Sequence, residues 1–484
     1  MATINTNDLR IQNAKNLISS LNDGADANAY VFVGRVQPWP DDNAPTPPQN
    51  NFKTFYTTYD DMVALNRIQT NDSYHMIRKT KWVSGVAYDR YQHNYNIVNK
   101  SFTGASDLYD ARYYVINSLN TVYVCLDNNN NGNSTVEPAA DTDDAFYTSD
   151  GYQWLRLYNI NSNTLAVRST NNLMPIIPTA PNVQKSGAIY TVLVDDGGLL
   201  YTRNPAGATN QISGYFAHID GDGTGAVAKV SISNTVITKI EVVRTGQNYT
   251  FATLDFSSGN VYQSLGDLDN GVNGLDPEGN GNFRSTVIIS PPGGWGSDLP
   301  RQLGGTKVGI FSTLNTPLFV ENYDCPIRQV GILQDFEFNG TNPTSLNACF
   351  AVRLTGIATG QSYIVGETIE QEITFDGDPK KAKGTVVGWN SEFGVLRYVQ
   401  GSSNVDTDGV LYPFTGTNDV IGLSSQLNGS PFEFTGELTD MEFVNGYADP
   451  DLTQYSGLMT YLSNISPITR DPQQSERVSL VVSF

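Results

Sequence analysis

Residues 126–138, LDNNNNGNSTVEP, combine the residue types that bind calcium in an EF-hand loop. Such a loop carries ligands at positions 1, 3, 5, 7, 9 and 12, with Gly at position 6 and a bidentate Glu at position 12. Positions 1, 3, 5 and 6 are matched here, by Asp127, Asn129, Asn131 and Gly132. Glu137, however, stands one position too early, Pro138 takes position 12, and the preceding TVYVCL is not helical in character. We therefore interpret the stretch as a turn after a strand ending at Leu126, since Asn tolerates left-handed backbone.

The other residues with metal or nucleophile chemistry form no recognisable motif. DGDGTG at 220–225 imitates the calcium loop again, but its twelfth position is Ser231. The three histidines, His75, His93 and His218, are far apart in sequence. GQSYI at 360–364 lacks the second Gly of a nucleophile elbow, and the chain contains neither a Walker loop nor HExxH. We predict no metal ligands and no cofactor-binding residues.

The 49 acidic residues include no evident pair for acid–base catalysis. Adjacent Asp pairs occur in contexts typical of solvated turns, at 41–42, 60–61, 143–144 and 195–196. A glycosidase needs two carboxylates that flank one glycosidic bond, and distant positions could supply them in space. We predict no catalytic residues and a protein that is not an enzyme, with a polysaccharide-degrading β enzyme as the open alternative.

The chain has 484 residues and is strongly acidic. Its 29 basic residues leave a net charge of −20, which repels phosphate backbones and anionic lipids. We therefore expect neither nucleic acid nor a membrane as a partner. Cys125, Cys325 and Cys349 are too scattered for a disulfide framework and are expected to be buried reduced thiols, as in a cytoplasmic protein. The N-terminal sequence has no apolar segment of a signal peptide, and no run is long enough for a membrane span.

Hydrophobic spacing predicts few helices and many short strands. Leu9, Leu17 and Leu21 favour a helix over Asn7–Asn22, and a second helix is expected over 58–69, where Met62 and Leu65 fall on one face. Short β-rich segments are bounded by Gly, Asn, Asp and Pro: TVYVCL (121–126), AIYTVLV (188–194), VAKVSI (227–232) and KGTVVGW (383–389). The predicted fold class is mostly β with a few N-terminal helices (α+β), as multidomain β-sandwich- or barrel-like modules.

An internal repeat joins two parts of the Gly-rich region. IYTVLVDDGGLLYT (189–202) aligns without gaps to ITKIEVVRTGQNYT (237–250), which matches Gly198 with Gly246 and Tyr201 with Tyr249. A shorter copy, TGQSY, occurs at 359–363. The common unit is a strand, a Gly-containing turn and a Tyr that packs back on the strand. Repeated β units without charged clusters favour a scaffold.

Proline-rich breaks at 38–48, 174–181 and 290–300 suggest how the chain is divided. The predicted parts are an N-terminal α+β region (1–178), a Gly-rich β-repeat region (179–290), a core β region (291–354), a β module (355–450) and a C-terminal segment returning to the core (451–484). The second and fourth parts are candidate insertions. For PWPDDNAPTPP (38–48) we hypothesise a preformed extended arm that docks on a neighbouring protein, with an intrachain surface loop as the alternative.

Several phrases together resemble the dimeric wedge subunit of contractile-tail baseplates, a family of T-even-type bacteriophages and their relatives. They are YVFVGRVQPWPDDNAPTPP (30–48), YVCLDNNNNGNSTVEP (123–138), DGYQWLRLYNI (150–160), SPPGGWGSD (290–298), LGGTKVGI (303–310), IRQVGIL (327–333) and the tail SGLMTYLSNISPITRDPQQSERVSLVVSF (456–484). The phrases follow the order of the family. Trp295 stands where members commonly have His, and 464–466 replaces an acidic-Asn-Arg run.

The resemblance implies a structural virion protein of the tail baseplate, made in the host cytoplasm. Such subunits form homodimers, join other wedge proteins and rearrange when the tail contracts. The resemblance implies neither catalysis nor a cofactor. The alternative from another class is a carbohydrate-binding, tail-fibre-like adhesin, which would need aromatic clusters on an exposed face of the Gly-rich repeats.

Overall fold

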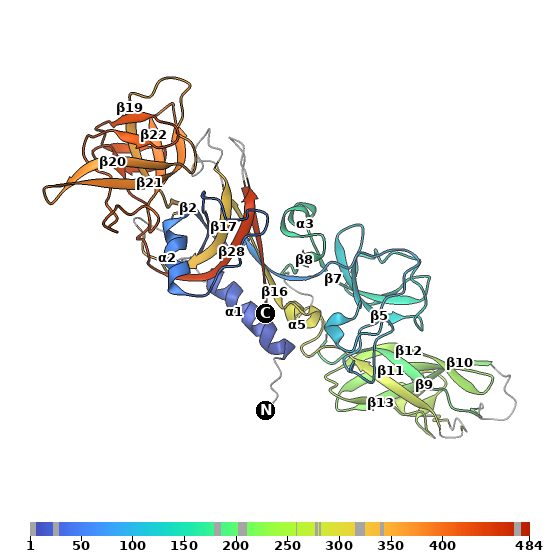
Figure 1. Cartoon of the computed structure of the whole chain (residues 1–484). Coiled ribbons are helices and arrows are strands. Elements are labelled where there is room, and N and C mark those ends of the chain that lie inside the picture. The colour runs from blue at the N-terminus through green and yellow to red at the C-terminus, as the bar shows by residue number, and fades with distance from the viewer. Residues whose placement is uncertain are drawn as a thin grey trace. The chain divides into compact units, whose positions relative to one another are not determined.

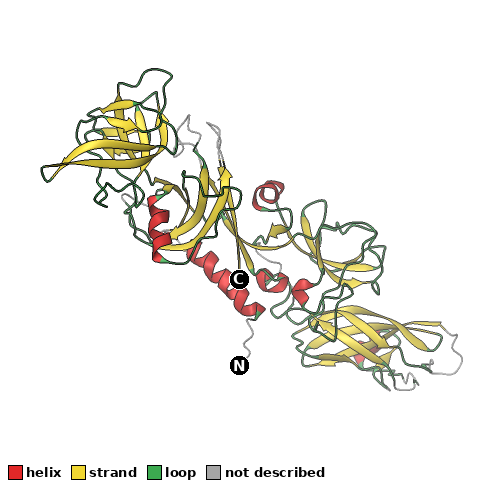
Figure 2. Ribbon diagram, viewed as in Figure 1, coloured by secondary structure: helices red, strands yellow, loops and turns green. Residues whose placement is uncertain are grey.

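The computed structural model describes residues 6–22, 29–178, 185–201, 211–257, 259–275, 279, 282–314, 325–338, 343–468 and 476–484. The chain divides into two compact units. Unit 1 comprises Met1–Lys15, Tyr74–Val308 and Val482–Phe484, and unit 2 comprises Asn16–Ser73 and Gly309–Val481. Strands predominate and helices are few and short (Figure 2). The predicted mostly-β, multidomain fold class is confirmed.

Unit 2 contains a five-stranded antiparallel sheet in the order β18-β2-β1-β17-β28. Its strands are β1 (Ala29–Gly34), β2 (Met62–Arg67), β17 (Ile327–Gln334), β18 (Ser345–Asn347) and β28 (Leu458–Ile468). Helix α2 (Phe52–Asp60) lies beside this sheet (Figure 1) and packs Phe55 and Tyr59 into its core. The helix begins after Asn51, whose side chain accepts a hydrogen bond from the N–H of Thr54 and so caps it.

The two predicted helices have different outcomes. Helix α1 spans Asn7–Asn22, as predicted. The helix predicted over 58–69 is wrong, because α2 ends at Asp60 and Met62–Arg67 is strand β2. Every residue from Met62 to Asn66 is buried, so the strand lies inside the sheet and lacks the polar alternation that marks a half-exposed strand. A short buried strand of this kind has the same apolar spacing as a helix.

The second part of unit 2 is a small β-barrel. Its sheet runs β22-β21-β20-β23-β24-β19-β27, and an additional pairing of β22 with β19 closes the first six strands. The strands are β19 (Phe350–Thr355), β20 (Thr368–Phe375), β21 (Asp378–Asn390), β22 (Val395–Val399), β23 (Val420–Gly422), β24 (Asn428–Pro431) and β27 (Tyr447–Ala448). The hairpin of β25 (Gly436–Leu438) and β26 (Met441–Phe443) packs Phe443 against the barrel strand residues Ala351 and Val395. Closure gives each of these six strands a neighbour on both sides, although β20 pairs with β23 only over Ile369–Gln371.

Unit 1 contains a four-stranded sheet in the order β4-β5-β7-β6. Its strands are β4 (Tyr114–Ile116), β5 (Thr121–Asn128), β6 (Phe146–Tyr147) and β7 (Tyr152–Asn159). Around it lie the 3-10 helix η2 (Leu108–Asp110), α3 (Ser162–Arg168), α5 (Leu299–Leu303) and the paired strands β3 (Ser73–Arg78) and β8 (Leu173–Pro175). β16 (Lys307–Leu314) and β29 (Glu476–Ser483) are further strands of the chain. Trp154 and Trp295 are among the largest fully buried side chains.

The Gly-rich region of unit 1 is a β-sandwich. One layer is β12-β11-β10-β13 with β14 added, and the other is the ladder of β9 and β15. Their bounds are β9 (Ile189–Asp196), β10 (Gln211–Gly221), β11 (Thr224–Ser233), β12 (Val236–Gln247), β13 (Ala252–Leu254), β14 (Val261–Tyr262) and β15 (Arg284–Ile289), with α4 at Leu265–Asn270. Ile189 faces the sandwich core, whereas its neighbour Tyr190 packs into the core of the β4-β7 region. Successive side chains of β9 point to opposite faces of the strand, so β9 contributes to both cores and attaches the sandwich to the β4-β7 region.

The predicted repeat has a common structure in its copies. Gly198 and Gly246 have φ angles of +61° and +60°, and Tyr201 and Tyr249, three residues later, are both buried in the sandwich core. The short copy at 359–363 repeats the pattern in the barrel, where Gly360 has a φ of +86° and Tyr363 is buried. Thr202, the last residue of the first copy, lies outside the described residues. The copies thus share a left-handed Gly and a buried Tyr three residues later, but Gly246 lies within strand β12 and not in a turn after it.

The five predicted parts stay a prediction. The sandwich lies within the predicted 179–290 part, and the barrel strands β20 to β27 lie within the predicted 355–450 part. The predicted boundary between 178 and 179 adjoins residues 179–184, which lie outside the described residues. The tail strand β28 pairs with β17, which places part of the predicted 451–484 segment beside strand residues of the predicted 291–354 part.

Candidate functional site

The calcium-like stretch turns the chain by left-handed backbone. Strand β5 ends at Asn128, and the φ angles of Asn129, Asn130 and Asn131 are 47°, 54° and 65°. Asn128 is buried, and its side-chain amide donates to the side chain of Asn131 at 2.9 Å. The predicted Asn-rich left-handed turn is confirmed, although the strand runs two residues beyond the predicted end.

A carboxylate outside the stretch organises this turn. Asp150 accepts hydrogen bonds from five groups: Ser134 Oγ (3.1 Å), Thr135 N (2.7 Å), Val136 N (2.9 Å), Thr148 Oγ1 (2.5 Å) and Tyr152 N (3.4 Å). Burial raises the pKa of Asp150, but these donors lower it by more, so its pKa lies below the usual range. Sequence reasoning missed Asp150, because nothing local links it to a loop that begins more than a dozen residues earlier.

The two carboxylates of the calcium-like stretch accept hydrogen bonds from other groups of the same chain. Asp127 accepts a hydrogen bond from Asn129 N at 3.0 Å, and burial raises the pKa of its carboxyl. Glu137 instead accepts hydrogen bonds from the backbone and side chain of Ser118, at 2.7 and 3.0 Å. The two carboxylates are therefore engaged separately. In the described ranges no group of three or more His, Cys, Asp or Glu residues is arranged to hold a metal ion.

The second calcium-like stretch, 220–225, is also held by a hydrogen-bonded carboxylate. Asp222 accepts from Thr250 Oγ1 (2.5 Å), Thr250 N (2.8 Å) and Phe251 N (3.2 Å). The Thr250 side chain and these N–H groups lower the pKa of Asp222 to about 2. Thr250 directly follows the buried Tyr249 of the repeat, so this carboxylate fastens the β10–β11 turn to the end of the repeat unit.

The Asp60–Asp61 pair lines a polar pocket of about 400 Å³ in unit 2. Asp60 accepts hydrogen bonds from Tyr455 Oη (2.6 Å) and Ser402 N (3.0 Å), and Asp61 forms an ion pair with Arg35 at 2.7 Å. Burial raises the pKa of Asp61, and Arg35 offsets part of this rise. The interpretation of this pair as solvated turn residues is wrong, because Asp60 is 7% exposed. Its donors come from positions hundreds of residues away, which local sequence cannot reveal.

The pocket has the chemistry of a structural tether. Each carboxylate is held by donors from its own chain, and Asp60 links α2 to the loop after β22 through Ser402. A side chain at Gly401 would collide with Asp60, so the backbone approaches the carboxylate closely. The described lining contains neither His nor Cys, and its other polar residues are mainly Gln, Thr, Ser and Asn. Ser402 contacts Asp60 through its backbone N–H, so this contact does not activate the Ser402 hydroxyl as a nucleophile.

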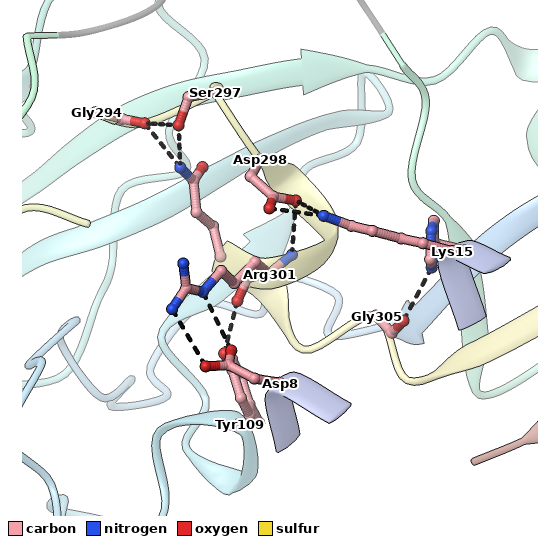
Figure 3. A network of polar contacts seen from close by, with 10 residues as sticks. Asp8, Lys15, Tyr109, Gly294, Ser297, Asp298, Arg301 and Gly305 are labelled. Atoms are coloured by element: carbon pink, nitrogen blue, oxygen red, sulfur yellow. Dashed lines mark hydrogen bonds and ion pairs between the residues drawn. The ribbon is translucent and has the colours of Figure 1, made fainter. Parts of the chain in front are cut away.

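A polar network in unit 1 joins the start of α1 to α5 (Figure 3). Asp298 caps α5 by accepting from Arg301 N at 3.3 Å, and Lys15 Nζ lies 2.8 and 2.7 Å from its two carboxylate oxygens. Arg301 reaches back to both carboxylate oxygens of Asp8, at 3.1 and 3.2 Å. Tyr109 donates to the carbonyl of Arg301 at 2.7 Å. Asp8 and Lys15 of α1 are therefore both bonded to residues at the start of α5.

The turn before α5 is equally well bonded. Gln302 donates to Gly294 O (2.7 Å) and Ser297 Oγ (3.0 Å) and accepts from Gly296 N (2.8 Å). Trp295, in the middle of this turn, is 1% exposed, and its ring lies 4.7 Å from that of Tyr91. The phrase SPPGGWGSDLP therefore contains a hydrogen-bonded turn whose Trp side chain is packed in the core.

A larger pocket of about 650 Å³ lies beside this network. Its lining mixes cations with carboxylates, and Asp107 already accepts a hydrogen bond from the Asn7 side chain at 3.1 Å. Arg78 donates to the carbonyl of Asp110 at 3.2 Å. The described lining contains no His, Ser or Cys.

The histidines and cysteines occupy separate places in the structure. His75 Nδ1 is 2.9 Å from the carbonyl of Gly305, and burial lowers the pKa of its imidazole. Burial also lowers the pKa of His93, while His218 lies in β10 beside the ring of Tyr262. The cysteines are confirmed as buried free thiols: Cys125, Cys325 and Cys349.

The Pro-rich segment 38–48 is neither helix nor strand, as predicted, and it is held by its own chain. Arg328, which is 8% exposed, donates to both oxygens of Asp42, at 2.9 and 2.8 Å. The guanidinium of Arg35 lies 3.9 Å from the ring centroid of Trp39, and Trp39 Nε1 donates to Ile465 O at 3.2 Å. These contacts favour the intrachain loop over the arm.

The described part of the Gly-rich region buries most of its large aromatic residues. Tyr201, Tyr215, Tyr249 and Phe256 belong to the sandwich core. Phe251, at 62% exposed, is the one aromatic between 185 and 290 in the described ranges that counts among the exposed large hydrophobic residues. The exposed aromatic cluster that a carbohydrate-binding face would need is therefore not seen among those residues.

The fold is that of a modular β protein. In the sites described above, the charged side chains form hydrogen bonds and ion pairs with groups of the same chain. No family model matches the chain, and no curated protein matches it significantly. No helix in the part of the chain that the structure describes is long and apolar enough to cross a bilayer.

Proposed function

We propose that this chain is a structural protein, a baseplate wedge subunit of a contractile phage tail. The subunit forms a homodimer and contacts other wedge proteins. The main support for this proposal is the position, within the structure, of the sequence phrases that resemble this family. Three of them, 30–48, 327–333 and 456–484, supply β1, β17 and β28, which are adjacent in one sheet. Sequence likeness at mutually packed positions supports a shared fold, because such positions depend on one another.

The phrases of unit 1 are likewise packed together. The phrases 123–138 and 150–160 supply the paired strands β5 and β7. Trp295, from the phrase 290–298, belongs to the same buried cluster as Val124 and Leu155 of those strands. The departure from the common His at Trp295 therefore falls at a core position, where a large apolar ring is compatible with the packing.

The polar sites also support a mechanical role. The carboxylates of Asp60, Asp150 and Asp222 each accept hydrogen bonds from donors of the same chain. Carboxylates used in this way fix turns and hold elements together. A subunit that transmits force needs such internal rigidity and interfaces on its surface, whereas a glycosidase needs two carboxylates that flank a substrate.

Co-production with neighbouring gene products tests the proposal. The chain is purified with each protein encoded beside it, and complexes are followed by size-exclusion chromatography with light scattering. We expect a complex of fixed stoichiometry with at least one neighbour, and the neighbours without this chain serve as the control. A chain that elutes alone with every neighbour, or that hydrolyses host-surface glycans, would overturn the proposal.

A further inference from the structure

Strand β28 forms one edge of the five-stranded sheet of unit 2. It pairs with β17 on one side, and in the described ranges no other strand pairs with it. An unpaired edge presents backbone N–H and C=O groups to any strand that approaches it. With eleven residues, β28 is far longer than β18, the three-residue strand at the opposite edge.

The exposure of β28 differs from that of the strands beside it. All of its residues are at least partly exposed, whereas β17 is buried at seven of eight positions and β1 at every position. Leu458 is 59% exposed and Ile468 52%. Both faces of β28 are therefore less covered than the sheet interior, as expected where a further strand would complete the packing.

The charge pattern of β28 differs from that of another long edge strand, β12. Strand β12, at the edge of the sandwich, carries Lys239, Glu241 and Arg244, the kind of charges that discourage edge pairing. Residues 452–469, which include β28, contain no charged residue. In a chain with a net charge of −20, two copies repel each other, so a surface that contacts its own copy must avoid like charges.

The two halves of β28 are not equally open. In the second half, Trp39 Nε1 donates to Ile465 O at 3.2 Å, and the Asn464 side chain donates to Thr46 O at 2.8 Å. Beside the first half runs a groove of about 320 Å³, lined by 459–462 on one side and by Pro48 to Asn51, Thr54 and Phe55 on the other. The accessible part of the edge is therefore 458–463.

An aromatic patch adjoins this open half. Phe52 and Tyr56, one turn apart on α2, are 81% and 49% exposed, and Tyr455 is 42% exposed. The rings of Tyr56 and Tyr455 meet edge to face, with centroids 5.3 Å apart. Tyrosines in such positions cover much area at low entropic cost and are enriched in protein interfaces.

We infer that the open half of β28, 458–463, pairs with the same strand of a second copy of this chain. The inference rests on the homodimer of the proposed function and names its contact. Two identical strands that pair antiparallel are related by a two-fold axis, so the edge is complementary to itself. Backbone hydrogen bonds join the sheets, while Phe52, Tyr56 and Tyr455 supply apolar contact at its side.

Charge substitution at Thr460 tests the pairing. Thr460 is exposed and lies near the centre of the open half, so two copies bring their residues 460 close to the axis. Three samples are compared by light scattering and sedimentation: the Thr460→Glu chain, the Thr460→Lys chain, and an equimolar mixture of both. We expect each variant alone to dimerise roughly tenfold more weakly than wild type and the mixture to recover pairing.

Thr374→Glu and Thr374→Lys are the matched controls, since Thr374 is likewise an exposed strand threonine but lies in β20, where it pairs with Pro379 of β21. Circular dichroism confirms that every variant is folded. A wild-type chain that is monomeric at all concentrations overturns the inference, and so does a dimer unaffected by either Thr460 substitution. Wedge assembly is scored separately with the neighbouring gene products. A dimer insensitive to position 460 that still assembles refutes this contact and leaves the proposed function standing.

Discussion

Replacement of Gly246 and of Gly225 by Ala measures how much a side chain would destabilise the sandwich where two backbones approach closely. The pairs Thr224–Gln247 and Ala226–Thr245 bracket them, so the two glycines lie opposite one another on β11 and β12. Both have left-handed φ angles, +60° at Gly246 and +82° at Gly225. Replacement by Ala therefore carries a comparable backbone penalty at the two positions, of about 1–2 kcal/mol.

The space around the two glycines differs. A Cβ at Gly246 would lie 2.6 Å from Ala226 N and 2.7 Å from Thr224 O, whereas at Gly225 the nearest heavy atom, Gly246 Cα, is 4.0 Å away. Backbone atoms cannot rotate away, so Gly246→Ala must push β11 and β12 apart. Overpacking of this kind adds about 1–3 kcal/mol. The opening free energy of this sheet should thus fall by about 2–5 kcal/mol in Gly246→Ala and by about 1–2 kcal/mol in Gly225→Ala.

Hydrogen exchange followed by mass spectrometry is the suitable assay, because it reports the stability of one sheet within a chain of several modules. Peptides covering β11 and β12 should exchange roughly five- to a hundredfold faster in Gly246→Ala than in Gly225→Ala, while barrel peptides keep the wild-type rate in both. Equal acceleration in the two variants would refute the reasoning, since φ alone would then account for the effect.

Four further predictions follow from individual contacts. Tyr249→Phe removes a hydroxyl that donates to Ile219 O (2.9 Å) and accepts from Ala226 N (3.2 Å). The free energy of unfolding of the sandwich, measured by hydrogen exchange in urea, should therefore fall by about 1–3 kcal/mol. Tyr262→Phe, at a partly exposed ring, is the control and should change this free energy little. The pKa of Asp222 is lowered to about 2 in the folded chain, so its stabilising contribution is complete above the ordinary carboxyl pKa, near 4, and disappears as the pH falls through 2. An NMR titration of its carboxyl carbon reads this directly, and a midpoint near 4 would contradict it. Calorimetric titration of the wild type with calcium should show no tight binding, and tight binding abolished by Asp127→Ala would restore the metal interpretation. Deletion of 41–48 leaves the buried Arg328 without the carboxylate of Asp42, so the melting temperature should fall; loss of dimerisation at an unchanged melting temperature would favour the arm instead.

The structure shows which sequence signals were strong. Helix α1 was predictable because its apolar residues recur at helical spacing over sixteen residues. The Asn-rich turn after β5 and the Gly–Tyr repeat were predictable because left-handed backbone restricts residue choice locally. The helix expected over 58–69 failed because β2 is buried throughout and so carries no alternation.

By itself, the sequence determined the mostly-β class, the positions of the turns and the repeat, since these depend on residue types a few positions apart. Only the tertiary structure decided the pairing of β1, β17 and β28, the closure of the barrel and the donors that reach Asp60 and Asp150. Such contacts join positions that can be hundreds of residues apart, as Asp60 and Tyr455 are. Their formation depends on the packing of whole elements, and this is also why the open edge of β28 could be recognised only in the folded sheet.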